Sequence, residues 1–364
     1  MNDFWKMPLV ELTERAREAT RRIHGEGVTY VVNRNANFTR VCQVGCAFCG
    51  FGRRPGTRGA TADTIDEVVT RVGKTPWVTE VCLQGGIDPN LPPAYYFDLI
   101  RALREAYPWI HLHAFSPMEI DSLCEKSGQE PEEVVVRLRA AGVGSIPGTA
   151  AEILVDRVRR KISRNKLPAD RWIRIVKAAH RAGLRSSATI LFGHVETWED
   201  IRGHFEVLRR VQGETGGFTE FVPLAFVPYE NRLGRILARR HGGMNRLEER
   251  IRRRARRLYP LARLVLGDLI PNLQTSWVKL GVAGAAESLD WGCNDFGGTL
   301  YEEAITRSSG GRHGEKLEAD QIEAAIRGAG RIPKRRTTLY GDVKNPFSLG
   351  KKSCQPSAGG HVAI

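Results

Sequence analysis

The sequence predicts an α/β fold, a (β/α) barrel of the TIM type, and three observations favour it. Short apolar runs of strand character alternate with helical segments of about 10–15 residues, which is typical of βαβ units with parallel strands. Eight such strands can be counted along the chain. The GxGxxG signature that an open dinucleotide-binding sheet carries after its first strand is absent, and a group of cysteines stands in its place.

The strands are expected where β-branched and aromatic residues cluster ahead of turn-forming residues. They span residues 28–33, 80–84, 110–115, 144–146, 187–192, 218–224, 274–280 and 292–295. Helices are expected where apolar residues recur every three or four positions and a glycine follows the last turn. They span residues 10–23, 62–72, 94–106, 131–141, 169–182, 198–212, 247–266 and 318–329.

The 364 residues divide into three parts on this interpretation. Residues 1–27 form an N-terminal helical extension, residues 28–312 form the barrel, and residues 313–364 form a C-terminal helix and a loose tail. No repeat of 20–50 residues is found, which argues against a solenoid. Because TIM barrels carry their active sites at the C-terminal ends of the strands, we expect the functional residues in the loops that follow the strands.

The composition narrows the class of protein. The chain has 55 Lys and Arg against 41 Asp and Glu, a net charge of +14, and 41% hydrophobic residues, which excludes a disordered or collagen-like chain. The densest basic run, 246–257, has apolar residues at helical spacing, so we interpret it as an outer helix rather than a nucleic-acid surface. The N-terminus lacks the apolar segment of a secretory signal, and no apolar run is long enough to span a membrane. We therefore expect a cytoplasmic protein with neither nucleic acid nor a membrane as its partner.

Three of the seven cysteines, Cys42, Cys46 and Cys49, lie in one eight-residue segment with the spacing C-x3-C-x2-C. Structural zinc takes four protein ligands, and a fourth would have to come from a distant residue such as His111 or Cys82. Three thiolates instead suit a [4Fe–4S] cluster with one iron left open for a ligand that is not protein. We interpret the segment as a cluster site, with zinc as the alternative.

The cysteine motif, with Phe48 just before its last cysteine and its place after the first strand, resembles that of the radical S-adenosylmethionine superfamily. The resemblance implies that the three cysteines bind a [4Fe–4S] cluster whose open iron binds S-adenosylmethionine. It also implies that Phe48 packs beside the adenine. The pair Gly85 and Gly86 after the second strand resembles the glycine-rich segment that takes the methionine amino group.

Longer segments resemble one branch of that superfamily, the tyrosine-using subunit of FO synthase. These segments are 35–49, 80–90, 111–120, 144–154, 193–196, 216–224, 276–281 and 294–303. The resemblance implies transfer of the 4-hydroxybenzyl group of L-tyrosine to 5-amino-6-(D-ribitylamino)uracil in the biosynthesis of the deazaflavin FO, the precursor of coenzyme F-420. It implies that a 5′-deoxyadenosyl radical takes a hydrogen atom from the tyrosine amino group and that the Cα–Cβ bond then breaks to release 2-iminoacetate. The implied partners are the other radical subunit of FO synthase and an electron donor.

Polar residues at or after the predicted strand ends are the candidates for binding these molecules. We assign Glu152 and Arg159 to the cofactor, because a guanidinium can pair with a carboxylate through two hydrogen bonds. The candidates for the substrates are His111, His113, Glu119, Glu196, Glu220, Asn294 and Asp295. His111 and His113 face the same side of their strand, because alternate residues of a strand point the same way.

Two other functions stay open on the sequence alone. After Leu224 the chain departs from the FO synthase pattern towards the radical enzymes of the futalosine route to menaquinone, such as aminofutalosine synthase. The net charge and the cysteine segment also allow a metal-bearing RNA-binding protein. That function predicts an appended basic module with a stacking platform, and the sequence has none.

Overall fold

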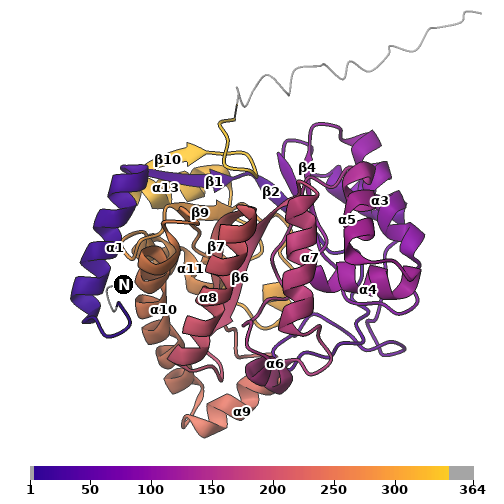
Figure 1. The fold of residues 1–364 in the computed structure, drawn as a ribbon. Coiled ribbons are helices and arrows are strands. Elements are labelled where there is room, and N and C mark those ends of the chain that lie inside the picture. The colour runs from indigo at the N-terminus through magenta and orange to yellow at the C-terminus, as the bar shows by residue number, and fades with distance from the viewer. Residues whose placement is uncertain (1–3, 344–364) are drawn as a thin grey trace, which may run out of the picture.

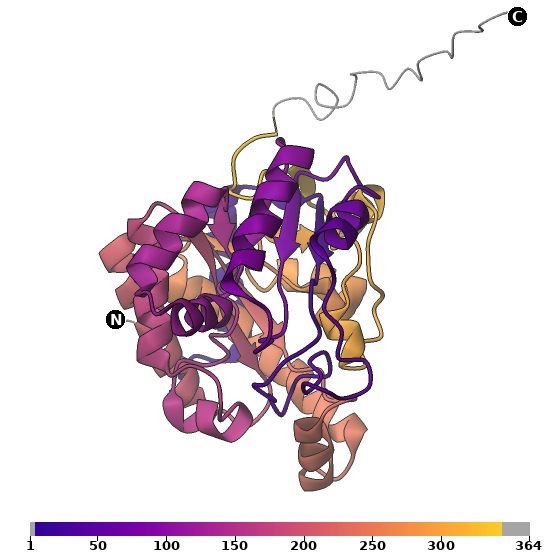
Figure 2. The ribbon, with the colours of Figure 1, turned by 90° about the vertical axis from the view of Figure 1, so that its right-hand side faces the viewer.

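The structure, a computed structural model, describes residues 4–343. The tail predicted after residue 343 lies outside the described residues. Parallel strands form a curved sheet with helices packed around it (Figures 1 and 2). The strands are β1 (Gly27–Val31), β2 (Asn33–Ala36), β3 (Glu80–Leu83), β4 (His111–Ala114), β5 (Ser145–Ile146), β6 (Arg185–Phe192), β7 (Phe218–Ala225), β8 (Asn272–Leu273), β9 (Asp295–Gly298) and β10 (Ile332–Arg335). The helices are α1 (Leu9–His24), α2 (Ile65–Val72), α3 (Pro93–Ala106), α4 (Pro117–Ser127), α5 (Pro131–Ala141), α6 (Asp156–Ile162), α7 (Ala169–Arg181), α8 (Trp198–Thr215), α9 (Arg232–Arg240), α10 (Met244–Leu266), α11 (Trp277–Leu289), α12 (Ile305–Ser308) and α13 (Ala319–Gly328).

Two sheets together make the predicted barrel. Strands β2 to β8 follow one another in a seven-stranded parallel sheet, and β1 lies between β10 and β9 in a three-stranded one. Gln274, directly after β8, pairs with Asp295 of β9, and the Asn35 N–H of β2 donates to the Tyr301 carbonyl oxygen at 2.9 Å. These bonds join β8 to β9 and the chain after β9 to β2, so the hydrogen-bonded strands form a closed ring. The predicted (β/α) barrel is confirmed.

Local sequence signals explain where many of the helices begin and end. Ser and Thr residues cap the first turns of α2, α4 and α8 through reciprocal capping boxes: Thr64 with Glu67, Ser116 with Glu119, and Thr197 with Asp200. Left-handed glycines follow α4, α5 and α8 at Gly128, Gly142 and Gly216. The basic helix α10 packs against α1 on the outside of the barrel, as Figure 1 shows.

The strand predicted over residues 274–280 is wrong for most of its length. Only Asn272–Leu273 form β8, and α11 starts at Trp277. Trp277 and Val278 have strand character but are buried in the first helical turn, where the Trp277 indole N–H donates to the Gly298 carbonyl oxygen at 2.8 Å. Gly281, with a φ of 76°, interrupts the helix after that turn.

Other differences concern short elements. The strand predicted over 28–33 divides into β1 and β2, which pair with different neighbours, and the strand predicted over 292–295 begins only at Asp295. The helices α4, α6, α9 and α12 and the strand β10 were not predicted; three of these helices span fewer than ten residues. Short elements give little periodic signal, so tertiary contacts decide them.

The strand ends place the functional residues. The chain after β2, indigo to purple in Figure 2, crosses the end of the barrel at which α9 lies. This is the C-terminal end of the parallel strands, the end at which TIM barrels hold their sites. In the part of the chain that the structure describes, no helix is both long and apolar enough to cross a membrane.

Candidate active site

The three cysteines of the predicted motif lie on one loop that backbone hydrogen bonds fasten on several sides. The Cys42 N–H donates to the Arg53 carbonyl oxygen at 2.7 Å, and the Gln43 N–H donates to that of Ile87 at 2.9 Å. The Ala47 N–H donates to the Ile162 carbonyl oxygen at 2.8 Å. The cysteines form no disulfide, and all three line a cavity of about 230 Å³, here named the mouth cavity.

The glycine pair after β3 lets this loop approach the barrel. A Cβ on Gly86 would lie 2.1 Å from the Val41 carbonyl oxygen and 2.9 Å from the Cys42 Cβ. A Cβ on Gly85 would lie 2.7 Å from the Phe38 ring. Both glycines line the mouth cavity. Glycine is therefore required here because the cysteine loop packs directly on the backbone.

Glu119, a predicted substrate residue, holds this glycine segment in place. Its carboxylate accepts the Gly85 N–H at 2.9 Å and both the N–H and the hydroxyl of Ser116 at 2.7 Å. Burial raises the pKa of Glu119 to about 7, although these hydrogen bonds oppose the shift. Glu119 thus joins the start of α4 to the end of β3, and it lines the mouth cavity.

A buried ion pair lies across the mouth cavity. Lys166, which the sequence analysis did not single out, pairs with the predicted residue Glu152, and its ammonium lies 5.5 Å from the centroid of the Phe48 ring. Burial raises the pKa of the Cys46 thiol to about 12, and the charge of Lys166 acts in the opposite direction. Lys166 therefore favours the thiolate, the form that binds metal.

The mouth cavity fits the cofactors that the resemblance implies. Three soft sulfur ligands suit a [4Fe–4S] cluster, and an aromatic ring, a close-packed glycine backbone and a buried ion pair suit S-adenosylmethionine, which has an adenine, an amino group and a carboxylate. Neither His111 nor Cys82, the distant candidates for a fourth zinc ligand, lines this cavity. Within residues 4–343, no group of three or more His, Cys, Asp or Glu side chains is arranged to hold a single metal ion.

A second cavity of about 240 Å³, here named the barrel cavity, lies among the strands and adjoins the first. The two cavities share several lining residues: Gln84, Thr149, Thr189, Leu224, Lys279 and Ile305. His113 and Glu220, two of the predicted substrate residues, line the barrel cavity. His113 Nδ1 lies 2.6 Å from the Ser145 hydroxyl, and burial lowers the pKa of His113 to about 4, so its ring is neutral at pH 7.

Glu220 is expected to make the stability of the protein depend on pH. The residue is 8% exposed, and its Oε2 is buried with no hydrogen-bond partner among the described residues. Burial raises the pKa of Glu220 to about 7, with Arg336 opposing, so folding favours the neutral form. The stabilisation is complete below the unfolded pKa of about 4.3 and is lost as the pH rises through about 7.

We expect the free energy of unfolding to fall between pH 5 and pH 8.5 by about 3 kcal/mol more in the wild type than in Glu220→Gln. Urea unfolding of the anaerobic, metal-free proteins across this range measures the difference. Equal slopes in the two proteins would show that Glu220 titrates normally.

Arg159 and His111 lie outside both cavities. Arg159 is 2% exposed, and its guanidinium donates to the carbonyl oxygens of Ala150, Ala151 and Leu167. It therefore fastens the loops that carry Glu152 and Lys166. His111 Nε2 lies 2.7 Å from the same Ser145 hydroxyl that His113 approaches.

Three more predicted residues also lie outside the two cavities, although each follows or begins a strand. The Glu196 carboxylate accepts the N–H groups of the turn after β6 and pairs with Arg254 at 2.8 Å. Asn294 Oδ1 accepts from Arg263 at 2.7 Å, and Asp295 pairs with Arg336 at 2.5 Å. In the structure these polar groups bind other parts of the chain.

Three cations that line the cavities were not predicted from the sequence: Lys166, Lys279 and Arg336. Lys279 lies in a segment that carried the resemblance. That segment was predicted to be a strand, whereas in the structure Lys279 lies at the start of α11. Lys166 follows α6, and Arg336 follows β10, neither of which was predicted. The available signal for Lys279 was a charged residue within 276–281, an otherwise largely apolar segment that carried the resemblance.

Comparison with known proteins places the chain in a family. Residues 36–208 match the model of the radical SAM superfamily, whose members use a [4Fe–4S] cluster and S-adenosylmethionine. Residues 215–349 match the CofH/MqnC C-terminal region. The chain is 16% identical to methylornithine synthase PylB, with a TM-score of 0.68 over 90% of this chain and 89% of that one. It is 14% identical to the hydrogenase maturase HydG from Carboxydothermus hydrogenoformans, with a TM-score of 0.66 over 93% of this chain and 75% of that one. At these identities the likeness concerns the fold.

Relatives of higher identity carry more specific names. The chain is 46% identical to the FO synthase of Nocardia farcinica and 45% identical to that of Mycobacterium tuberculosis, over 90% and 92% of its length. It spans only 37% and 38% of those two proteins. It is 42% identical to the 5-amino-6-(D-ribitylamino)uracil–L-tyrosine 4-hydroxyphenyl transferase of Methanococcoides burtonii, over 92% of both chains. The chain therefore belongs to the radical SAM superfamily and, within it, to the family of these 4-hydroxyphenyl transferases.

Proposed function

We propose that this chain is a radical SAM transferase that joins the 4-hydroxybenzyl group of L-tyrosine to 5-amino-6-(D-ribitylamino)uracil, as a step in the biosynthesis of FO. The by-products would be 2-iminoacetate, methionine and 5′-deoxyadenosine. The observation that carries the proposal is the 42% identity over 92% of both chains to the transferase of that name. None of the relatives described above supports the menaquinone-route or RNA-binding alternatives.

The mouth cavity is the proposed cofactor site. Cys42, Cys46 and Cys49 would bind three irons of the cluster, and Gly85 to Gly86, Glu152, Lys166 and Phe48 would surround S-adenosylmethionine. When bound, these cofactors supply a radical that abstracts a hydrogen atom from a substrate. The protein would hold the cluster ligands in a fixed position, because backbone hydrogen bonds attach the cysteine loop to neighbouring segments on several sides.

The barrel cavity is the proposed substrate site. It adjoins the mouth cavity through shared lining residues, so a substrate inside the barrel lies next to the cofactors. His113 and Glu220 offer hydrogen bonds to the polar edge of the uracil or to the tyrosine phenol. Strand residues such as Glu80, His113 and Val222 line this cavity, so a substrate bound there would be partly surrounded by the barrel.

We further propose two protein partners and a compartment. The FO synthase relatives are more than twice as long as the segment that this chain matches, which supports a second radical enzyme of FO synthesis as a partner. An external protein would donate the electron that the cluster needs. The six described cysteines are all free, which suits the reducing conditions of the cytoplasm.

Anaerobic reconstitution followed by a product assay tests the function. The reduced protein, given S-adenosylmethionine, tyrosine and the diaminouracil, is expected to form an adduct whose mass contains both the 4-hydroxybenzyl and the ribityl groups. Mass spectrometry detects the adduct, and [ring-¹³C₆]tyrosine should shift its mass by six units. Turnover of a chorismate-derived futalosine precursor without this adduct would favour the menaquinone route. A colourless protein that binds zinc and RNA would exclude both radical functions.

A further inference from the structure

The two connected cavities contain one cation that the structure leaves without a partner. Lys166 pairs with Glu152 in the mouth cavity, and Arg336 pairs with Asp295 at the barrel cavity. Lys279 lines both cavities, and among the described residues its ammonium has neither a hydrogen bond nor an ion pair. Lys279 is half-buried, and an ammonium that is partly removed from water is stabilised by an anion, so we expect a ligand anion beside it.

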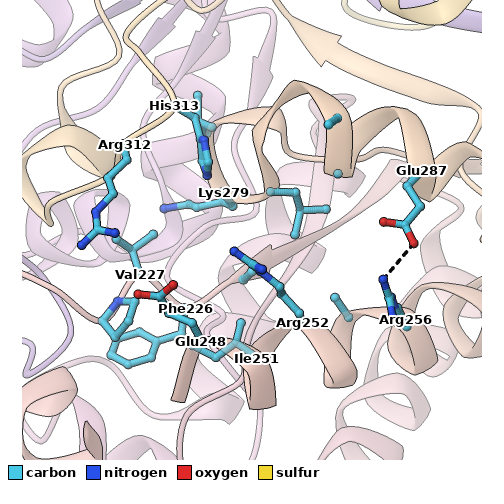
Figure 3. Close-up of a pocket in the computed structure, with 18 of the residues that line it drawn as sticks. Phe226, Val227, Glu248, Ile251, Arg252, Arg256, Lys279, Glu287, Arg312 and His313 are labelled. Carbon is cyan, nitrogen blue, oxygen red and sulfur yellow. Dashed lines mark ion pairs between the residues drawn. The ribbon is translucent and has the colours of Figure 1, made fainter. Parts of the chain in front are cut away.

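The position of Lys279 restricts which anion it can bind. Lys279 lies in the single helical turn that precedes the break at Gly281, at the boundary between the two cavities. Its side chain also forms part of the wall of a third cavity of about 410 Å³, lined largely by α10 and α11. Figure 3 shows this third cavity, in which Lys279 extends on the side of Val227 and away from the ion pair of Arg256 and Glu287.

A carboxylate close to Lys279 indicates a ligand with two charges. The charges of Glu303 in the barrel cavity and of Cys49 and Glu152 in the mouth cavity all act on Lys279, Glu303 the most strongly. No ion pair joins Lys279 to Glu303. Both oxygens of the Glu303 carboxylate accept the Thr306 N–H, at 2.9 and 3.1 Å, which fixes its position. A cation and an anion that are near each other but unpaired match the carboxylate and amino groups of an α-amino acid.

We propose that Lys279 binds the α-carboxylate of the amino-acid substrate at the boundary between the cavities, with the amino group on the side of Glu303. This inference rests on the proposed function, since it takes tyrosine as the amino acid. Binding of the carboxylate there would direct the aromatic side chain into the barrel cavity and hold the amino group beside the mouth cavity. Lys279 would then set both the affinity for tyrosine and the alignment of its amino group with the cofactors.

Isothermal titration of the reconstituted, unreduced protein loaded with S-adenosylmethionine tests the inference without turnover. The ligands are L-tyrosine and tyramine, which lacks the carboxylate. The wild type is expected to bind tyrosine about 10- to 100-fold more tightly than tyramine, the range for a hydrogen bond between charged groups. Lys279→Met is expected to lose that preference by weakening tyrosine alone, and Lys279→Arg to keep part of it.

The matched control is Arg252→Met, which removes a positive charge from the wall of the third cavity and should leave both affinities unchanged. Affinity for S-adenosylmethionine should change less than about threefold in Lys279→Met. An unchanged preference for tyrosine in that variant would overturn the inference, and so would an equal loss of S-adenosylmethionine binding, which would assign Lys279 to the cofactor. A wild type that binds no tyrosine and forms no adduct would refute the proposed function together with this inference.

Discussion

Cys46→Ala is expected to abolish binding of the iron–sulfur cluster and with it the cleavage of S-adenosylmethionine. Cys46 is the central cysteine of the loop whose three cysteines line the mouth cavity, the proposed cluster site. Loss of a residue that merely supports a metal ligand costs about 10–100-fold in affinity or activity, so loss of a direct ligand should cost at least about 100-fold. Iron and sulfide content and the visible absorption of the anaerobically reconstituted protein measure the cluster, and release of 5′-deoxyadenosine measures the cleavage.

Cys124→Ala is the matched control for that experiment. Cys124 is 3% exposed on α4 and lines neither the mouth cavity nor the barrel cavity. This variant should retain its iron and its activity. A Cys46→Ala protein with wild-type iron content would show that the cysteine loop is not the cluster site.

Gly86→Ala is expected to damage the same site without removing a ligand. The added Cβ would lie 2.1 Å from the Val41 carbonyl oxygen, and backbone cannot move aside as a flexible side chain can. Overpacking of this kind costs about 1–3 kcal/mol of stability, and here the displaced segment carries Cys42. We expect lower stability and an iron content well below that of the wild type after identical reconstitution.

Gly213→Ala separates this steric effect from the general effect of replacing a glycine. Gly213 lies in α8, and a Cβ there would have no neighbour within 4 Å. Alanine should therefore leave the iron content unchanged and raise the stability by up to about 1 kcal/mol. Equal iron content in Gly86→Ala and Gly213→Ala would contradict the close packing of the cysteine loop against Gly86.

The sequence allowed prediction of those parts of the site that depend on local spacing. The cysteine motif, Phe48 and the glycine pair lie within a few residues of a strand end, so the alternation of strands and helices was enough to place them at the barrel mouth. Glu152 was found in the same way. The positions of these residues follow from their short distance in sequence from a strand end, which can be read directly from the sequence.

Spacing alone does not determine what a side chain contacts, so the structure adds partners that the sequence could not predict. Glu196 and Asp295 were chosen for their positions at strand ends, yet each is paired with an arginine from a distant segment, Arg254 and Arg336. Such pairs span 58 and 41 residues of sequence. Lys279 was not predicted because residues 274–280 were assigned to a strand. In the structure, Lys279 lies in the first turn of α11 instead.

The strand β10 has a consequence for how the chain can be shortened or joined to another. It adds to β1 outside the ring, and the next residue, Arg336, reaches Asp295 and lines the barrel cavity. A segment from near the end of the described chain thus supplies part of the wall of the barrel cavity. A truncation before Ile332 would remove Arg336 and leave the buried Asp295 carboxylate without its ion pair, whereas a fusion attached beyond residue 343 would keep both residues.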